Sequence, residues 1–156
     1  MEKKFILTDK FVINSFGIKL FQIKCTKSFK YAQKGDFGGY VEKEGNLDQE
    51  NDAWVFGNAR VSGDARVFGN AWVSGDADIE NDNEHCGFDG FGSANRHTHA
   101  YLTKENKVEI TCGCFRGSIE EFEKRVEETH SGTVYEKQYK SIINVIKIKF
   151  GLTDLI

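Results

Sequence analysis

The chain has 156 residues, 39% of them hydrophobic, which is enough for one compact domain with a buried core. Its 21 Lys and Arg against 24 Asp and Glu give a formal net charge of −3, which argues against a general binder of nucleic-acid polymers. The sequence lacks both the apolar run of about 18 or more residues that a membrane span needs and the apolar segment of a signal peptide. We therefore expect a cytoplasmic protein that does not bind membranes.

The first segment, residues 1–36, is predicted to form an N-terminal β cap. The stretches FILT and Ile18–Cys25 are predicted to be strands, and the turn-like sequence Asn14–Gly17 separates them. Cys25 belongs to a set of four cysteines that is too small and too unevenly spread for a disulfide scaffold. We expect all four to be thiols.

Residues 37–84 divide into eight hexads, and the phrase V-x-G-[ND]-A-x occurs in four of them. Gly-Asn and Gly-Asp pairs in these hexads favour a tight corner, because glycine tolerates positive φ and the short polar side chains bond the local backbone. Two columns of apolar residues recur and are predicted to fill the core. Their members are Val55, Val61, Val67, Val73 and Ile79, and Val41, Leu47, Ala53, Ala59, Ala65, Ala71 and Ala77.

This phrase resembles the hexapeptide repeat of left-handed parallel β-helices. The resemblance implies a mainly β fold in which a short left-handed helix of parallel strands stacks residue i on residue i+18. That stacking would place Trp54 over Trp72, with Phe56 beside them. The aromatic face formed by Trp54, Phe56 and Trp72 has two interpretations: the chain's own terminal segments cover it, or it is a protein interface.

After Asn83 the period ends, and the glycine-rich residues 85–95 are predicted to be a linker. Residues 96–156 are predicted to form a β-β-α-α domain. RHTHAYLT and KVEITCGCF make its hairpin, Ser118–Glu121 offers a capping box for a first helix, and Tyr135–Phe150 has helical spacing for a second.

The chain resembles a group of small phage and prophage proteins in three segments. These are the lead-in from Lys19, the GGYVE-type and GNA or GDA hexads, and the segment CGCFRGSIEEFEKRVEETH. The resemblance implies that the two halves work as one unit. It assigns no activity to the group as a whole.

The most tempting metal ligands are His97, His99, Cys112 and Cys114. A two-residue turn at Glu105-Asn106 would set His99 opposite Cys112 and His97 opposite Cys114 on one face of the hairpin. Alternation on a flat hairpin gives a rectangle, however, and zinc needs a tetrahedron. We therefore favour buried thiols and partly buried histidines, and expect neither a metal nor another cofactor.

Acyl transfer is the activity implied by the hexapeptide resemblance, but its general-base histidine is missing from the hexads and only His85 follows them. We expect instead a non-enzymatic, oligomeric binding protein. Under the phage resemblance it would counteract a bacterial antiviral defence, either by occluding a defence protein or by sequestering a cyclic nucleotide signal. Arg96, Phe115 and Arg116 are the candidate ligand-binding residues for sequestration. A structural or assembly role is the remaining alternative.

Overall fold

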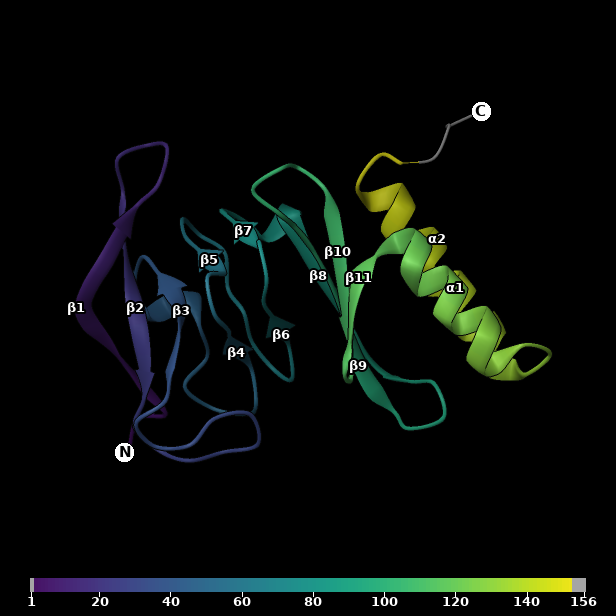
Figure 1. Ribbon diagram of the computed structural model, residues 1–156, viewed down its shortest axis with the longest axis horizontal. Helices are drawn as coiled ribbons and strands as arrows, with labels where there is room; N and C mark the ends of the chain where they lie inside the picture. Colours follow the sequence, from purple (N-terminus) through teal and green to yellow (C-terminus); the bar gives the residue numbers. More distant parts are fainter. Residues whose placement is uncertain (1, 153–156) are drawn as a thin grey trace.

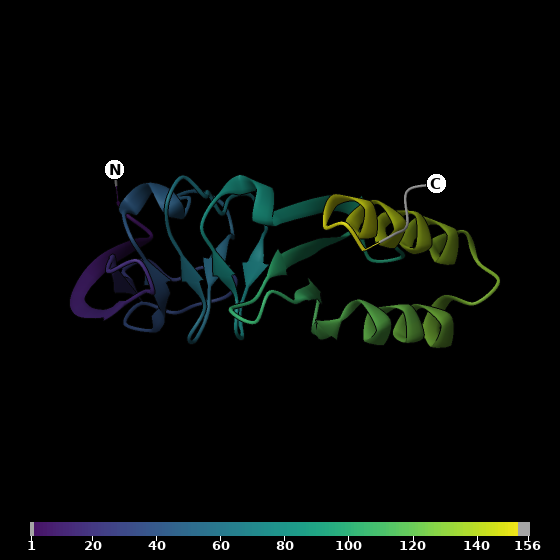
Figure 2. The same cartoon turned by 90° about the horizontal axis from the view of Figure 1, so that it is seen from above.

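The computed structural model describes residues 2–152. The molecule is elongated, with an N-terminal hairpin at one end, the repeat region of residues 37–84 in the middle, an antiparallel sheet beyond it, and two helices at the other end (Figures 1 and 2). None of the helices described in residues 2–152 has the length and apolar character needed to cross a bilayer.

The first sheet is five-stranded and mixed, in the order β1-β2-β3-β5-β7. β1 pairs with β2 and β2 with β3 in antiparallel ladders, and β5 pairs in parallel with both β3 and β7. These strands span Phe5–Ile13 (β1), Lys19–Cys25 (β2), Phe37–Val41 (β3), Arg60–Val61 (β5) and Asp78–Ile79 (β7). The predicted N-terminal strands are therefore confirmed.

A second sheet in the repeat region has two parallel strands, β4 (Trp54–Val55) and β6 (Trp72–Val73). Two short 3₁₀ helices, Glu44–Asn46 and Asp82–Glu84, lie near the two ends of this region. The valine and alanine columns face inward as predicted: Val55, Val61, Val67, Val73 and Ile79 are fully buried, and the alanines are at most 2% exposed.

The left-handed parallel β-helix was the wrong prediction for this region. Parallel pairing is confined to ladders of two residues and one isolated bridge, Leu47 to Val67, whereas the longer ladders are antiparallel. Glycine corners contribute to this, because Gly57, Gly63 and Gly75, all with positive φ, lie two residues beyond the ends of the short strands β4, β5 and β6. The two larger sheets are mixed or antiparallel, the parallel sheet has only two short strands, and no continuous hexapeptide solenoid forms in the part of the chain that is described.

The second half contains a four-stranded antiparallel sheet, in the order β11-β10-β9-β8. Its strands span His85–Phe91 (β8), Arg96–Leu102 (β9), Val108–Cys112 (β10) and Phe115–Ser118 (β11). The predicted hairpin is present, but the predicted linker at residues 85–95 is wrong. Most of it is β8, which pairs with β9 from His85 to Phe91.

Helices α1 (Ile119–His130) and α2 (Val134–Lys149) pack on one face of this sheet (Figure 2). The predicted capping box is confirmed: Ser118 Oγ accepts the backbone N–H of Glu121, and the Glu121 carboxylate accepts that of Ser118. The opposite face of the sheet covers the end of the repeat region, where Tyr101 joins the core of the repeats.

Candidate functional site: a cleft between the repeats and the antiparallel sheet

A cleft of about 420 Å³ lies where the repeat region meets the antiparallel sheet. We call it the aromatic cleft. Its walls include Lys30, Tyr31 and Trp72 on the repeat side, and Arg96 and His97 from β9 on the other side. Its volume falls in the range of pockets that hold small molecules.

The floor of the aromatic cleft is a cluster of rings. The centroids of Tyr31 and Trp72 lie 5.5 Å apart with planes at 37°, and Phe56 packs 5.0 Å from Trp72. Both Tyr31 and Trp72 are only partly buried, so their faces remain available for stacking. The Trp72 indole N–H is buried and has no hydrogen-bond partner within residues 2–152. A buried donor without an acceptor is costly.

Two cations flank these rings. The Lys30 ammonium lies 5.2 Å from the centroid of the Tyr31 ring, and the exposed Arg96 begins β9 on the opposite wall. Asp52 contributes an acidic group to the lining. Aromatic faces beside Lys and Arg form a surface suited to a planar ligand that carries negative charge.

The predicted ligand-binding residues separate into two places. Arg96 lines the aromatic cleft, and it shares a smaller pocket of about 120 Å³ with Phe115. Phe115 packs against Phe122 at 5.1 Å and lies under the guanidinium of Arg125. Arg116 points elsewhere, because its Nε lies 3.6 Å from Glu109 Oε1 and its guanidinium borders Gly75. The predicted ligand-binding residues Arg96, Phe115 and Arg116 therefore do not form one site.

The predicted interface of Trp54, Phe56 and Trp72 is not an exposed face. Trp54 is 1% exposed and is covered edge-on by Phe5 at 6.3 Å and Phe29 at 5.2 Å. The N-terminal segment thus covers this face, which was one of the two interpretations of the sequence. Sequence reasoning missed Tyr31, whose place beside Trp72 depends on a contact between residues 41 positions apart.

The four side chains of the zinc hypothesis that we did not favour, His97, His99, Cys112 and Cys114, do not converge. The β9–β10 ladder sets His99 opposite Thr111 and Cys112 opposite Thr98, which is one residue away from the predicted register. Such a slip turns side chains to opposite faces of the sheet. Its cause is the longer turn, closed by the backbone N–H of Thr103 donating to the carbonyl of Lys107. Residues 2–152 contain no cluster of three or more His, Cys, Asp or Glu side chains suited to a metal ion.

The thiols show little sign of nucleophilic activation. Burial raises the pKa of Cys25 and of Cys86 above the ordinary value, which disfavours the reactive thiolate. Cys112 is buried against the helices, where it accepts the hydroxyl of Thr98 at 3.3 Å. The cysteines thus serve the packing of the core, and Cys114 is exposed.

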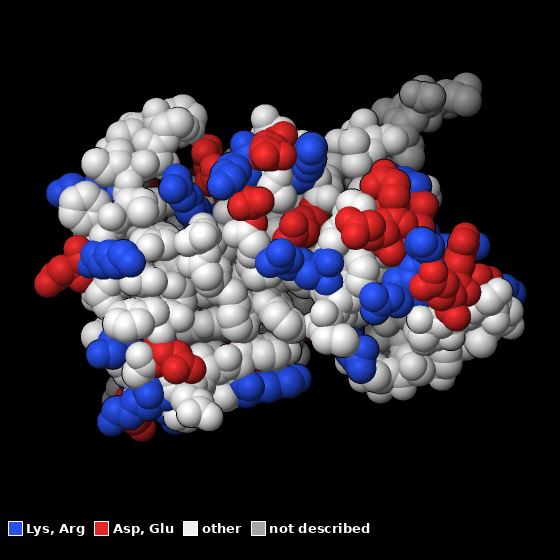
Figure 3. Space-filling view, viewed as in Figure 1, with Lys and Arg blue, Asp and Glu red and all other residues white. Residues whose placement is uncertain are grey.

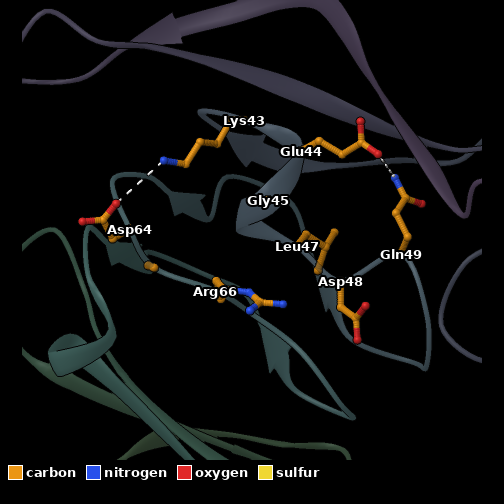
Figure 4. A pocket seen from close by; sticks show the side chains of 9 residues that line it. Lys43, Glu44, Gly45, Leu47, Asp48, Gln49, Asp64 and Arg66 are labelled. Carbon is orange, nitrogen blue, oxygen red and sulfur yellow. Dashed lines mark hydrogen bonds and ion pairs between the residues drawn. The ribbon is translucent and has the colours of Figure 1, made fainter.

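A second open pocket of about 470 Å³ lies on the outer surface of the repeats (Figure 4). Its charges are of both signs and partly neutralise each other: Lys43 faces Asp64 at 3.9 Å, and the Gln49 amide donates to Glu44 at 3.2 Å. It offers no aromatic surface. On the face shown in Figure 3, Lys and Arg are interspersed with Asp and Glu, so no broad positive area for nucleic acid is visible there.

Comparison of the sequence with protein-family models gives no match, and comparison with curated proteins gives none either. The resemblance to small phage and prophage proteins is therefore not supported. The sheet arrangement counts against it as well, since the left-handed β-helix that it implied is not formed.

Proposed function

We propose that the protein is a non-enzymatic binding protein that sequesters a small, planar, anionic ligand of the nucleotide class in the aromatic cleft. The observation that carries the proposal is the Tyr31–Trp72 ring pair between Lys30 and Arg96, in a cleft of about 420 Å³. Stacking on an aromatic side chain contributes about 1–3 kcal/mol per base, and arginine binds phosphate through paired N–H donors.

We favour sequestration over catalysis because the cleft combines aromatic faces with the cations Lys30 and Arg96. Its one histidine, His97, is engaged at both ring nitrogens, by Asp89 and by His99. A cyclic nucleotide signal of a bacterial cell is the ligand that we favour, and the cytoplasm is the compartment that we propose. The four free cysteines are compatible with a reducing compartment.

Thermal denaturation against cyclic dinucleotides, cyclic ADP-ribose and acetyl-coenzyme A tests this function. A ligand present at about 100 times its Kd stabilises the native state by about 2.7 kcal/mol, which raises the melting temperature by several degrees. We expect a cyclic nucleotide to give this shift without being consumed. The proposal fails if no nucleotide in the panel stabilises the protein, or if the bound nucleotide is converted to a product.

Substitution of the cleft tryptophan locates the site. We expect Trp72→Ala to weaken binding about 10-fold or more, through the loss of one stacking surface. The matched control is Phe68→Ala, another aromatic of the repeats that is 61% exposed and does not line the aromatic cleft. Equal binding by both variants would place the ligand elsewhere.

A second proposal, a protein contact, is favoured by the exposed apolar end of the molecule. Phe11, Ile13 and Phe16 of the β1–β2 hairpin are 43%, 56% and 71% exposed, and exposed apolar clusters mark contact surfaces. We propose that this end joins copies of the chain in a homo-oligomer. Light scattering should give a multiple of 17.7 kDa for the wild type and a smaller particle for Phe16→Asp. A monomeric wild type rejects this contact.

A further inference from the structure

Three histidines and two aspartates form one hydrogen-bonded line, which we call the histidine chain. His85 Nε2 lies 3.0 Å from Asp82 Oδ1, and His85 Nδ1 lies 2.9 Å from His99 Nε2. On the other side, His99 Nδ1 lies 2.9 Å from His97 Nε2, and His97 Nδ1 lies 2.7 Å from Asp89 Oδ1. Each imidazole therefore uses both of its nitrogens.

The three rings of the chain are sheltered from water, whereas its two terminal carboxylates are exposed. His99, its central ring, is 4% exposed, and its centroid lies 5.1 Å from those of both His85 and His97. The rings border a cavity of about 350 Å³ that Phe68 also lines. Because of this burial, water replaces a broken contact at His99 poorly, and the number of protons in the chain decides whether it holds together.

A count of protons shows what the chain needs. Each of its four contacts is a hydrogen bond only if one proton lies between the two heavy atoms. Three neutral imidazoles carry one proton each, and two ionised carboxylates carry none, which gives three protons for four contacts. One contact would then set a lone pair against a lone pair. One additional proton satisfies all four contacts, and a fifth would crowd two protons into one contact.

We propose that the histidine chain binds one extra proton in the folded protein and is a pH-sensitive clasp between the repeat region and the antiparallel sheet. With the charge on His85, that ring donates to Asp82 and His99, His99 donates to His97, and His97 donates to Asp89. Transfer of the proton from His85 Nδ1 to His99 Nε2, with transfer from His99 Nδ1 to His97 Nε2, moves the charge to His97. The total number of protons stays at four.

The groups around the chain favour the single positive charge on one of its two end rings, His85 or His97. Burial, followed by the charges of His85 and His97, lowers the pKa of His99 well below the ordinary value, so the central ring stays neutral. Each end ring faces a carboxylate. Three other titratable or charged groups lie nearby. Arg66 acts on Asp82 through its charge and its backbone N–H, and Cys86 lies beside the cavity. The Tyr101 ring lies 6.4 Å from that of His99, and its hydroxyl donates to Glu109.

The chain connects parts that are distant in the sequence. Asp82 accepts the backbone N–H of Arg66 at 2.9 Å and also contacts His85, so it joins the hexad of residues 61–66 to β8. His85 then connects to His99 on β9. Loss of the extra proton at high pH, or binding of a further proton at low pH, would open the histidine chain and loosen this connection. His97 also borders the aromatic cleft, so the free end of the clasp lies at the candidate ligand site.

Imidazole ¹⁵N spectroscopy over a pH titration of the metal-free protein tests the proposal. We expect a plateau of pH in which the three rings together carry four protons, and simultaneous changes in all three at both edges of the plateau. Three rings that titrate independently, with no plateau at four protons, would overturn the proposal. Stoichiometric binding of Zn²⁺ at the three rings, in place of the proton, would also overturn it.

Two variants separate the clasp from a purely structural role. At Gly87 an added Cβ would lie 2.7 Å from His97 Nε2 and 2.8 Å from His99 Nδ1, so Gly87→Ala should separate these rings and abolish the simultaneous titration. Gly45→Ala, where no atom lies within 4 Å of the added Cβ, is the control. Asp89→Asn alters only an exposed end and should move the upper edge of the plateau to lower pH. An unchanged titration in either Gly87→Ala or Asp89→Asn contradicts the clasp.

Discussion

Thr111 donates its hydroxyl to the carbonyl oxygen of Trp72 at 2.7 Å, which fastens β10 to the last part of the repeat region. Thr111 is 2% exposed, and Trp72 forms part of the floor of the aromatic cleft. A neighbouring contact, from the backbone N–H of Lys104 to the carbonyl of Asp76 at 2.9 Å, holds the same two bodies together. The position of the cleft walls thus depends on a few polar contacts between the repeats and the sheet.

Thr111→Val should destabilise the protein by about 1–3 kcal/mol, because the carbonyl of Trp72 loses its buried donor while the side-chain volume is nearly unchanged. Urea denaturation measures the loss. Thr98→Val is a matched control on β9, since the Thr98 hydroxyl contacts only the weak acceptor Cys112 Sγ. Equal losses in the two variants would show that the Thr111–Trp72 bond has no special role.

Trp54→Ala should cost about 3–5 kcal/mol of the free energy of unfolding, as for other large buried aromatics, because Trp54 lies under Phe5 and Phe29. Phe68→Ala, at an exposed position of the same repeats, should cost less than about 1 kcal/mol. Chemical denaturation of both variants checks the difference. A small effect of Trp54→Ala would mean that the N-terminal segment does not cover this ring in solution.

Two corner glycines should differ sharply in their tolerance of alanine. Gly57 and Gly63 both have positive φ, 57° and 60°, so alanine is strained by about 1–2 kcal/mol at either position. At Gly63 the added Cβ would also overlap the carbonyl oxygen of Glu80, whereas nothing lies within 4 Å at Gly57. Gly63→Ala should therefore lower the melting temperature more than Gly57→Ala. The reverse order would be incompatible with the packing of these two hexads.

The contribution of Lys4 to the unfolding free energy should rise with pH between about 8 and 10, whereas the raised pKa values of Cys25 and Cys86 act in the opposite direction. Burial lowers the pKa of Lys4 from 10.5 to about 8, although its ammonium donates to the carbonyl of Ala53 at 2.7 Å. Above pH 8 the folded protein releases this proton and the unfolded chain keeps it, so this contribution to stability increases with pH. Denaturation at several pH values checks this slope. Lys4→Met should remove it, and an unchanged slope in that variant would assign the effect to another group.

On the acid side, stability should fall as the pH decreases below about 6.5, the ordinary value for histidine. Because the pKa of His99 is lowered in the folded state, the unfolded chain binds a proton there that the folded protein does not. The loss continues until His99 itself is protonated. His130, on a helix away from the chain, offers a control: His130→Gln should keep the acid slope, whereas His99→Gln should reduce it.

Local features of the sequence predicted local features of the structure. The six-residue spacing identified the buried valine and alanine columns, and the Ser118 to Glu121 spacing identified the start of α1. The helical spacing of Tyr139, Ile142, Ile143 and Ile146 identified the buried side of α2. These patterns are readable because the backbone period and the cap depend on residues only a few positions apart.

The β-helix prediction failed because the six-residue repeat is also a local pattern, and strand pairing is not decided locally. A repeat of six residues fixes where corners fall, but it does not fix how many strands pair in parallel. In this protein β2 pairs antiparallel with β3, and β8–β11 form an antiparallel sheet of their own. Those pairings depend on segments outside the repeat, which the repeat itself does not specify.

The candidate site was decided almost wholly by tertiary structure. Arg96 and Trp72 were selected from the sequence for separate reasons, and only the docking of the sheet on the repeats sets them around one cleft with Tyr31. The histidine chain depends likewise on the β9 register, which sets His99 opposite Gly87 of β8 and brings its ring to that of His85. The sequence determined which residues are buried in each hexad and where the helices begin, because these follow from local periodicity. The fold alone decided which distant side chains meet, because a shift of one residue in strand register turns each side chain to the opposite face.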